Sequence, residues 1–234
     1  MERNRLLLLA AAAAAAIVAV VVIVVVAGGG SSTTQPTTTQ TTRGGGTEAT
    51  RTFAGVAQHG ATLGKASAPA TMYVFEDPQC PYCRQWNIDT LPTVVDNYVR
   101  AGRVKLVYRG IQIIGANSIV GISAIYAAGL QGKAWQMAEA LYERQGAENS
   151  GWITLGVVRQ AAGEIHANVA KLVKDMKSDA VLTEMRASAG QAQSLGVQGT
   201  PTFGIQKPLG TIEQLQISSL DPSGFTPALD AALS

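Results

Sequence analysis

The chain has 234 residues, a nearly balanced formal charge of +2 and a mean hydropathy of +0.15. A balance this close to neutral excludes the strongly basic surface on which nucleic-acid binding usually depends. Two cysteines are too few for a scaffold of several disulfides or a four-cysteine zinc site. Two histidines are likewise too few for most histidine-rich metal centres.

The first 27 residues have the composition of a membrane anchor. Arg3 and Arg5 precede an uncharged run of 22 residues from Leu6 to Ala27. A helix of that length spans about 33 Å, enough to cross a hydrocarbon core of about 30 Å. Because both arginines lie before the run, the positive-inside rule places the N-terminus in the cytoplasm. We therefore expect residues 1–27 to be a cytoplasmic stub and a transmembrane anchor, with a cleaved signal peptide as the alternative.

Residues 28–50 separate this run from the rest of the chain. They are rich in threonine and glycine and contain no large apolar side chain, so they cannot bury enough surface to offset the entropy of ordering. We expect a flexible linker. Residues 51–234 follow, with 15 basic and 14 acidic side chains, and are long enough for one well-buried core. In either topology this domain is exported.

The first half of the domain predicts a strand–helix–strand unit. Residues 71–75 form a short apolar run that is typical of a buried strand. A helix is expected to begin at Pro81, and Pro92 either kinks it or starts a second piece that continues to Tyr98. Residues 104–108 alternate as a second strand. This order favours two parallel strands joined by a helical crossover.

The second half is dominated by helical spacing of apolar residues. We expect an inserted helical unit over about 115–190, after which strand character returns at 202–205 and again near 215–217. A last helix is predicted from Pro222 or Thr226 to the end of the chain. The expected fold class is α/β with a helical insertion.

The two cysteines lie in a C-x-x-C sequence, Cys80-Pro81-Tyr82-Cys83, at the predicted strand-to-helix junction. The N-terminal end of a helix exposes unpaired N–H groups and the positive end of the helix dipole, which stabilise a thiolate. Cys80 occupies that position, and Cys83 lies about one helical turn further along the same face. The spacing therefore supplies an attacking thiol and a second thiol able to resolve a mixed disulfide.

Three other uses of these cysteines compete with thiol exchange. Zinc would need His59 and His166, which we expect in a loop and on a helix, and neither has the spacing of a ligand. A structural disulfide closing so short a loop would constrain few conformations. A cysteine hydrolase would need only one cysteine, paired with a histidine. We expect no metal.

A second motif lies at Gly196–Phe203, where Thr200-Pro201 directly precedes a predicted strand. Proline is disfavoured in a central strand because it cannot donate to the ladder. A cis peptide bond at the start of the strand would explain its place, and an ordinary turn is the alternative.

Together these features resemble the DsbA-like thioredoxin-fold oxidoreductases, in particular their membrane-tethered bacterial branch. The likeness covers nearly all of residues 53–205. It rests on Gly55 to Gly64, Ala68-Pro69, Phe75, Asp77, Cys80–Cys83, Tyr98, the 104–109 strand, Gly132–Trp135 with Leu141, and Gly196–Phe203.

The resemblance implies a thioredoxin core with an inserted helical domain and no cofactor beyond the two cysteines. It implies that Cys80 attacks and Cys83 resolves, with Pro81 and Tyr82 shaping the site between them. It also implies that Thr200-Pro201 is a cis bond packed against the disulfide and that the Thr200 backbone pairs with an extended substrate peptide.

Two positions depart from that family. Many members carry an acidic residue six positions before the first cysteine, where it relays a proton, but here that position is Val74. Glu76 and Asp77 are the nearest acids and become the candidates for proton transfer. The strongest oxidants of the family often have histidine between the cysteines, whereas this chain has Tyr82, so we expect a less oxidising couple.

We therefore expect an extracytoplasmic thiol–disulfide oxidoreductase that forms disulfides in exported proteins. Its partners would be exported protein thiols as substrates and a membrane redox partner that reoxidises it, with no nucleic acid. Two alternatives stay open: a reductase or isomerase, and a membrane-tethered peptide-binding module in which the cysteines are only regulatory.

Overall fold

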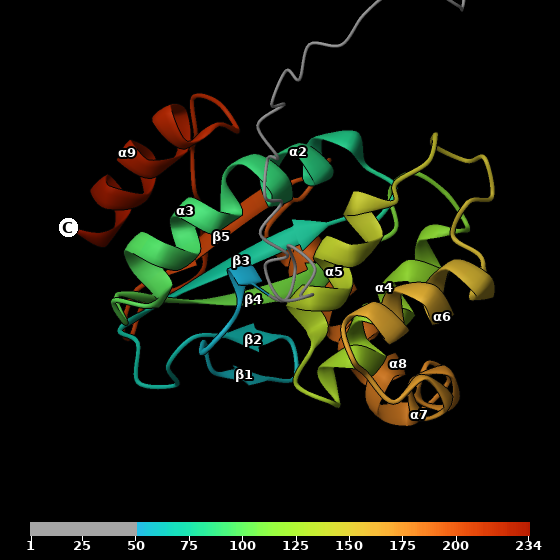
Figure 1. Ribbon diagram of the computed structural model, residues 1–234. Helices are drawn as coiled ribbons and strands as arrows, with labels where there is room; N and C mark the ends of the chain where they lie inside the picture. Colours follow the sequence, from blue (N-terminus) through green and yellow to red (C-terminus); the bar gives the residue numbers. More distant parts are fainter. Residues whose placement is uncertain (1–50) are drawn as a thin grey trace, which may run out of the picture. The chain divides into compact units, whose positions relative to one another are not determined.

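The structure, a computed structural model, describes residues 51–234, and the expected anchor (1–27) and linker (28–50) lie outside the described residues. A six-stranded sheet has the strand order β1-β2-β4-β3-β5-β6 (Figure 1). Only β3 and β4 are parallel, and every other neighbouring pair is antiparallel. The strands are β1 (Gln58–His59), β2 (Thr62–Leu63), β3 (Ala70–Glu76), β4 (Val104–Gly110), β5 (Thr202–Gln206) and β6 (Glu213–Gln214).

The central strands confirm the expected parallel pair, with β3 longer than expected at both ends and β4 longer at its carboxyl end. Strand β3 pairs with β4 from Ala70↔Val104 to Glu76↔Gly110. Six of the seven residues of β3 are buried, which explains its almost continuous apolar run, since a strand covered on both faces has no polar side to alternate with. Cys80 follows the end of this strand after three further residues.

The connection between these strands is helical in three pieces. Helix α2 (Pro81–Asp89) begins at the expected proline, and α3 (Leu91–Val94) is the expected second piece, with Pro92 in its first turn. A single π-helical turn, η1 (Val95–Val99), ends the crossover and was not predicted. Gly102 then takes a positive φ of 74°, which ends the helix and reverses the chain toward β4.

The helical insertion is present and extends from residue 118 to residue 194, slightly later than the expected 115–190. In Figure 1 its helices gather on the right, away from the C-terminal α9 on the left. Thr154, Asn168 and Ser178 cap three of them by accepting a hydrogen bond from a first-turn N–H. The five are α4 (Ser118–Gly129), α5 (Ala134–Glu143), α6 (Leu155–Glu164), α7 (Val169–Asp175) and α8 (Asp179–Ser194).

The C-terminal part corrects one expectation. The strand predicted near 215–217 is wrong: β6 is shorter and earlier, at Glu213–Gln214. The N–H of Leu215 still bonds the Phe203 carbonyl at 2.8 Å, but its side chain turns into the core and the chain leaves the sheet there. The last helix, α9 (Pro222–Leu233), begins at the first of the two expected positions and is capped by Asp221.

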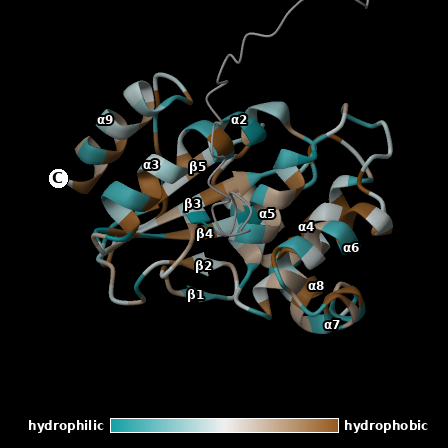
Figure 2. Cartoon of the chain, viewed as in Figure 1, coloured by the Kyte–Doolittle hydropathy of each residue, from teal (hydrophilic) through white to brown (hydrophobic). Residues whose placement is uncertain are grey.

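The main core lies between the sheet and the surrounding helices. Figure 2 shows hydrophobic residues along the central strands and on the helix sides that face them. Trp86 of α2, Phe203 of β5 and Phe225 of α9 pack together, with ring centroids 4.8–5.7 Å apart. This aromatic cluster fixes α2, and with it the cysteines, against β5.

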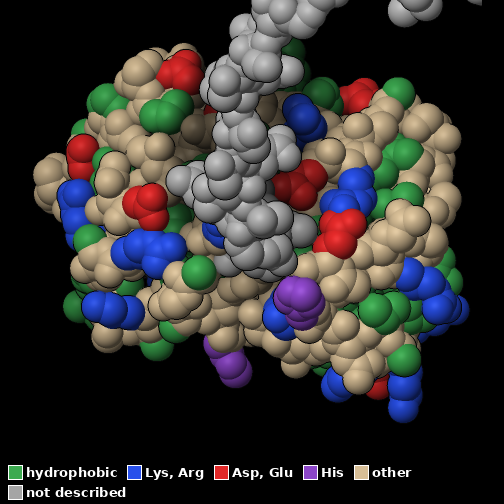
Figure 3. Space-filling model, in the orientation of Figure 1, with side chains coloured by type: hydrophobic (Ala, Val, Ile, Leu, Met, Phe, Trp, Pro, Cys, Tyr) green, Lys and Arg blue, Asp and Glu red, His purple; other side chains and the backbone are tan. Residues whose placement is uncertain are grey.

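The surface of the domain mixes both signs of charge. On the face shown in Figure 3, basic and acidic side chains are interspersed where grey atoms do not cover them. This pattern agrees with the near-neutral composition of residues 51–234. Among the helices of that same range, none combines the length and the hydrophobicity that a membrane span requires.

Candidate active site

Cys80 and Cys83 lie together at the first turn of α2. Cys80 is the N-cap residue with extended backbone (φ −75°, ψ 121°), and no side chain caps the helix there. The first-turn N–H groups of Tyr82 and Cys83 therefore face the Cys80 sulfur and stabilise its charged form. Both cysteines are free thiols, and they are only 4% and 0% exposed.

The pKa values of the two thiols are shifted in opposite directions. The hydrogen bond from Cys83, assisted by the Tyr82 and Cys83 N–H groups, lowers the pKa of Cys80 from 9.0 to about 6 despite its burial. Burial raises the pKa of Cys83 well above 9.0, and its hydrogen bond to Cys80 and the nearby Glu76 add to that shift. At neutral pH Cys80 is therefore mostly a thiolate, held by a protonated Cys83.

The Thr200-Pro201 segment lies against the nucleophile. The peptide bond between them is cis, as the resemblance implied. Cys80 Sγ lies 3.2 Å from the Thr200 carbonyl oxygen and donates to it when the thiol is protonated, although 120 residues separate them in sequence. This contact forms because β5, which begins at Thr202, pairs with β3 on the side opposite β4.

The two residues between the cysteines face solvent. Pro81 is exposed at the helix start, and the Tyr82 side chain is 62% exposed. An aromatic ring this exposed beside a buried sulfur offers an apolar contact surface to a protein that approaches the site.

Glu76 lies beneath the cysteines as a fully buried acid. Asn87 Nδ2 donates to its Oε1 at 2.5 Å and also to the Cys83 carbonyl at 3.0 Å, and the Tyr142 hydroxyl lies 3.4 Å from its Oε2. Burial raises the pKa of Glu76 from 4.5 to about 8, against the lowering effect of these two partners. Val74 lies two residues earlier on the same face of β3. The buried acid of this chain is therefore on the face where the resemblance implies one, two residues further along the strand.

Asp77 has a different environment. Its carboxylate accepts four hydrogen bonds, from the N–H groups of Gln79, Ile113 and Ile114 and from the Ser118 hydroxyl, at 2.7–2.9 Å. These donors place it as an anchor for the loop before α4. The structure thus brings Glu76 toward the sulfurs and turns Asp77 toward the insertion.

Three polar residues of the site were missed from the sequence: Asn87, Tyr142 and Gln79. Asn87 follows Cys83 by four residues on a helix, so its spacing alone could have placed it beside that cysteine. Tyr142 lies 66 residues from Glu76 and gives no local signal. Gln79 is fully buried, and its amide joins Ser118 to the Asn149 N–H.

The two histidines are not where the sequence suggested. His59 is exposed in β1, where a loop was expected, and His166 is exposed in the turn after α6, where a helix was expected. Within residues 51–234, no group of three or more histidine, cysteine or acidic side chains is placed to hold a metal ion.

Comparison with known proteins gives a consistent set of relatives. The family model described as thioredoxin matches residues 57–216. A probable disulfide bond formation protein D from Bacillus anthracis is 32% identical over 148 residues, which cover 60% of this chain and 67% of the relative.

Solved structures resemble the described domain as well. The oxidised BdbD of Bacillus subtilis superposes with a TM-score of 0.63 at 21% identity, covering 76% of this chain and 97% of that one. A thioredoxin-like oxidoreductase from Silicibacter pomeroyi has a TM-score of 0.56 at 31% identity, covering 73% of this chain and 90% of that one. The sheet, the insertion and the helical crossover described above are thus a known arrangement.

Proposed function

Because this chain belongs to the thioredoxin family and is a DsbA-like thiol–disulfide oxidoreductase, we propose that it forms disulfide bonds in exported proteins through a Cys80–Cys83 couple. One observation carries the proposal: the pKa values of two adjacent thiols are shifted in opposite directions. The pKa of Cys80 is lowered to about 6, and that of Cys83 is raised well above 9.0. An exchange enzyme needs this asymmetry, since one sulfur must be attacked and the other must accept a proton.

The reaction is a pair of exchanges starting from the Cys80–Cys83 disulfide. A client thiolate attacks Cys80 Sγ, the bond to Cys83 breaks, and Cys83 leaves as a thiolate that takes up a proton. A second client thiolate then attacks the client sulfur of the mixed disulfide, so that the client disulfide forms and Cys80 leaves as a thiolate. The client loses two electrons and the enzyme gains them.

Glu76 is the proposed proton carrier for Cys83. It is buried, lies within electrostatic range of both sulfurs, and has a pKa of about 8, so it holds a proton at neutral pH. Asn87 bridges its carboxyl to the Cys83 carbonyl and keeps it beneath the sulfur. A carboxyl with a pKa near the working pH both gives and recovers a proton readily.

The remaining predicted residues form the client-facing edge of the site. In this proposal the Thr200 backbone pairs with the extended client beside Pro201, and Tyr82 covers the client next to the scissile bond. The support is their position: Thr200 O lies 3.2 Å from Cys80 Sγ, and Tyr82 is exposed directly after the helix start.

The cellular setting is part of the same proposal. Residues 1–27 anchor the chain, 28–50 form a linker, and 51–234 work on the extracytoplasmic side, where disulfides persist. A membrane redox partner removes the two electrons after each turnover. The support is the 22-residue uncharged run after Arg5 and the disulfide-forming role that the name of the Bacillus anthracis relative records.

The redox potential of the couple tests the direction of the reaction. A thiolate pKa of about 6 lies between the values of thioredoxin, about 7, and DsbA, about 3.5, so we expect a potential between about −270 and −120 mV. Equilibration with glutathione buffers measures it. A value at or below that of thioredoxin would assign the protein to the reductases instead.

Two cysteine variants test the couple itself. Cys80→Ser should abolish oxidation of a reduced client protein. Cys83→Ser, incubated with a disulfide-bonded client, should accumulate a mixed disulfide, because the Cys80 thiolate attacks the client disulfide and no Cys83 thiol is present to release the client. Client oxidation that survives in Cys80→Ser would refute catalysis by this couple. Full complementation of a deletion strain by Cys80→Ser would identify a peptide-binding module.

A further inference from the structure

One segment of the helical insertion, residues 142–149, contacts every residue from the end of β3 to the nucleophile. The contacts are hydrogen bonds of 2.9–3.4 Å between residues that lie 65–70 positions apart in sequence. They join Tyr142 to Glu76 and to the Asp77 carbonyl, Gln145 to the Pro78 and Cys80 carbonyls, and Asn149 to Gln79. The insertion therefore lies directly against the loop that carries the attacking sulfur.

Within this set, Gln145 is the residue that contacts the cysteine itself. Its Nε2 donates to the Pro78 carbonyl at 2.9 Å and to the Cys80 carbonyl at 3.0 Å. Because carbonyls only accept, the amide must present its nitrogen here, and its two N–H bonds match the two acceptors. The Cys80 carbonyl also accepts a bond from the Arg84 N–H, at 3.1 Å. Both lone pairs of that oxygen are therefore used.

Gln145 is held in place by its own neighbours. It lies two residues after the end of α5, and its N–H bonds the Tyr142 carbonyl at 3.1 Å. The next residue is Gly146, where a Cβ atom would lie 2.9 Å from the Trp152 side chain. Only glycine allows the loop to approach that ring so closely, so the backbone on both sides of Gln145 is fixed.

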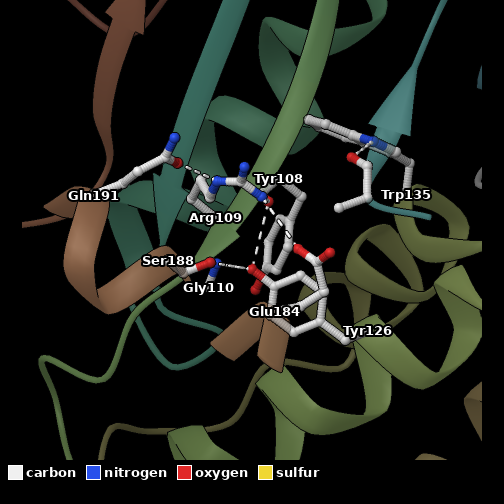
Figure 4. A network of polar contacts seen from close by, with 9 residues as sticks. Tyr108, Arg109, Gly110, Tyr126, Trp135, Glu184, Ser188 and Gln191 are labelled. Carbon is white, nitrogen blue, oxygen red and sulfur yellow. Dashed lines mark hydrogen bonds and ion pairs between the residues drawn. The ribbon is translucent and has the colours of Figure 1, made fainter. Parts of the chain in front are cut away.

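The helices that carry this segment are attached to the sheet as well. Trp135 Nε1 of α5 donates to the Ala61 carbonyl at 3.0 Å, next to β2. The Tyr126 hydroxyl of α4 accepts a hydrogen bond from the Gly110 N–H at 3.0 Å and shares another with Ser188 of α8 (Figure 4). Buried hydrogen bonds of this kind make the insertion rigid. The amide is therefore in place before a client arrives.

The Cys80 carbonyl matters because it belongs to the residue that carries the sulfur. The ψ angle of Cys80, 121°, sets where this carbonyl points and how the side chain lies over the first turn of α2. A donor that fixes the carbonyl thus keeps the sulfur facing the N–H groups of Tyr82 and Cys83. The negative end of a carbonyl dipole also opposes a nearby thiolate, and donors to that oxygen offset it.

We propose that Gln145 is a positioning residue for the nucleophile: through the Cys80 carbonyl, its amide aligns the sulfur with the first turn of α2 and favours the thiolate. The proposal rests on the proposed function, since it concerns Cys80 as the reacting sulfur. Three titratable groups face Cys80, namely Cys83 of α2, Glu76 of β3 and Tyr142 of α5, and all three are protonated at neutral pH. A change at position 145 is therefore not masked by the ionisation of these groups.

Two substitutions of Gln145 test the role, because they change what faces the Cys80 carbonyl in opposite ways. Methionine removes both donors at similar volume, whereas lysine presents a charged donor. We measure the rate at which iodoacetamide alkylates Cys80 in the reduced full-length protein at pH 5 and at pH 9. Since only the thiolate reacts and the pKa of Cys80 is about 6, the wild-type rate at pH 5 should be about a tenth of that at pH 9.

Gln145→Met should react about tenfold more slowly than wild type at pH 5, because losing hydrogen bonds of ordinary strength raises the pKa of Cys80 and lowers the thiolate fraction by about that factor. At pH 9, where the thiolate is nearly complete in both proteins, the two rates should agree. Gln145→Lys keeps a donor and adds a positive charge, so at pH 5 it should react at least as fast as wild type. Gln160→Met and Gln160→Lys, at an exposed glutamine of α6, are the matched controls and should equal wild type at both pH values.

The other outcomes separate the two proposals. A wild-type rate for Gln145→Met at pH 5 would overturn the role of Gln145 and leave the proposed function standing. Equal slowing of both Gln145 variants at both pH values would show that this residue only supports the fold, which also overturns the role. A wild-type protein that reacts more than about a thousandfold more slowly at pH 5 than at pH 9 would have an ordinary thiol at Cys80 and would refute the proposed function as well.

Discussion

At the scale of single residues, the chemistry of the site depends on which of Cys80, Cys83 and Glu76 hold a proton. Cys80 is ionised because Cys83 and two N–H groups donate to it, and Cys83 keeps its proton because it is buried beside Glu76. Glu76 in turn keeps a proton because burial raises its pKa to about 8. Because Glu76 is neutral while Cys80 is a thiolate, the protein interior does not hold two neighbouring negative charges.

Glu76→Gln should change how the stability of the reduced protein depends on pH. Since the native pKa of Glu76, about 8, exceeds its ordinary 4.5, the stability that it contributes is complete below pH 4.5 and is lost as pH rises through 8. Glutamine has no such loss. Relative to wild type, the variant should therefore gain roughly 2–4 kcal/mol in unfolding free energy between pH 5 and pH 8.

Urea unfolding of both reduced proteins at the two pH values measures this difference, because titrations common to both cancel. Glu148→Gln, at an exposed glutamate, is the matched control and should show no gain. Equal differences at pH 5 and pH 8 for Glu76→Gln would mean that Glu76 is ionised in the native state.

At the scale of elements, residues 77–79 fasten the helical insertion to the strand that leads to the nucleophile. The Asp77 carboxylate holds the loop before α4, and Gln79 joins Ser118 at the start of α4 to Asn149 in the loop before α6. The insertion is thus attached within three residues of Cys80, so its position and that of the sulfur are set together.

Gln79→Leu should destabilise the protein by about 2–5 kcal/mol, because it leaves the buried Ser118 hydroxyl and the Asn149 N–H without this amide. Chemical denaturation measures the loss, and hydrogen exchange should report faster opening of the first turn of α4. Gln160→Leu, at an exposed glutamine of α6, should be near neutral. A loss below about 0.5 kcal/mol for Gln79→Leu would show that the attachment does not depend on its amide.

The elements also show what the sequence can and cannot predict. Strands β3, β4 and β5 were foreseen because apolar runs and β-branched residues are local signals. Strands β1 and β2 have two residues each and exist only through pairing, β1 with β2 and β2 with β4, so they leave no periodicity to read in the sequence. Likewise Cys80 and Thr200 followed from motifs, whereas the different environments of Glu76 and Asp77 depend on partners 11 to 66 residues away.

At the scale of the whole molecule, the proposed anchor decides where the chemistry takes place. An uncleaved helix over residues 1–27 predicts that the protein stays in the membrane fraction after carbonate extraction, and that N-terminal sequencing of the mature protein starts at or next to Met1. The reason is the uncharged 22-residue run, long enough to span a bilayer. A soluble mature protein that starts after Ala27 would identify a signal peptide instead.

The sheet ends at both edges in a strand of two residues, β1 on one side and β6 on the other. A long unpaired edge is a template on which a foreign extended chain adds hydrogen bond after hydrogen bond, and this is how intermolecular sheets grow. An enzyme whose proposed clients are unfolded chains meets such templating partners at every turnover. Edges this short give a client almost no ladder to extend, so it is held by one exchangeable covalent bond, the short backbone contact at Thr200 and its side chains, and it can leave without aggregating.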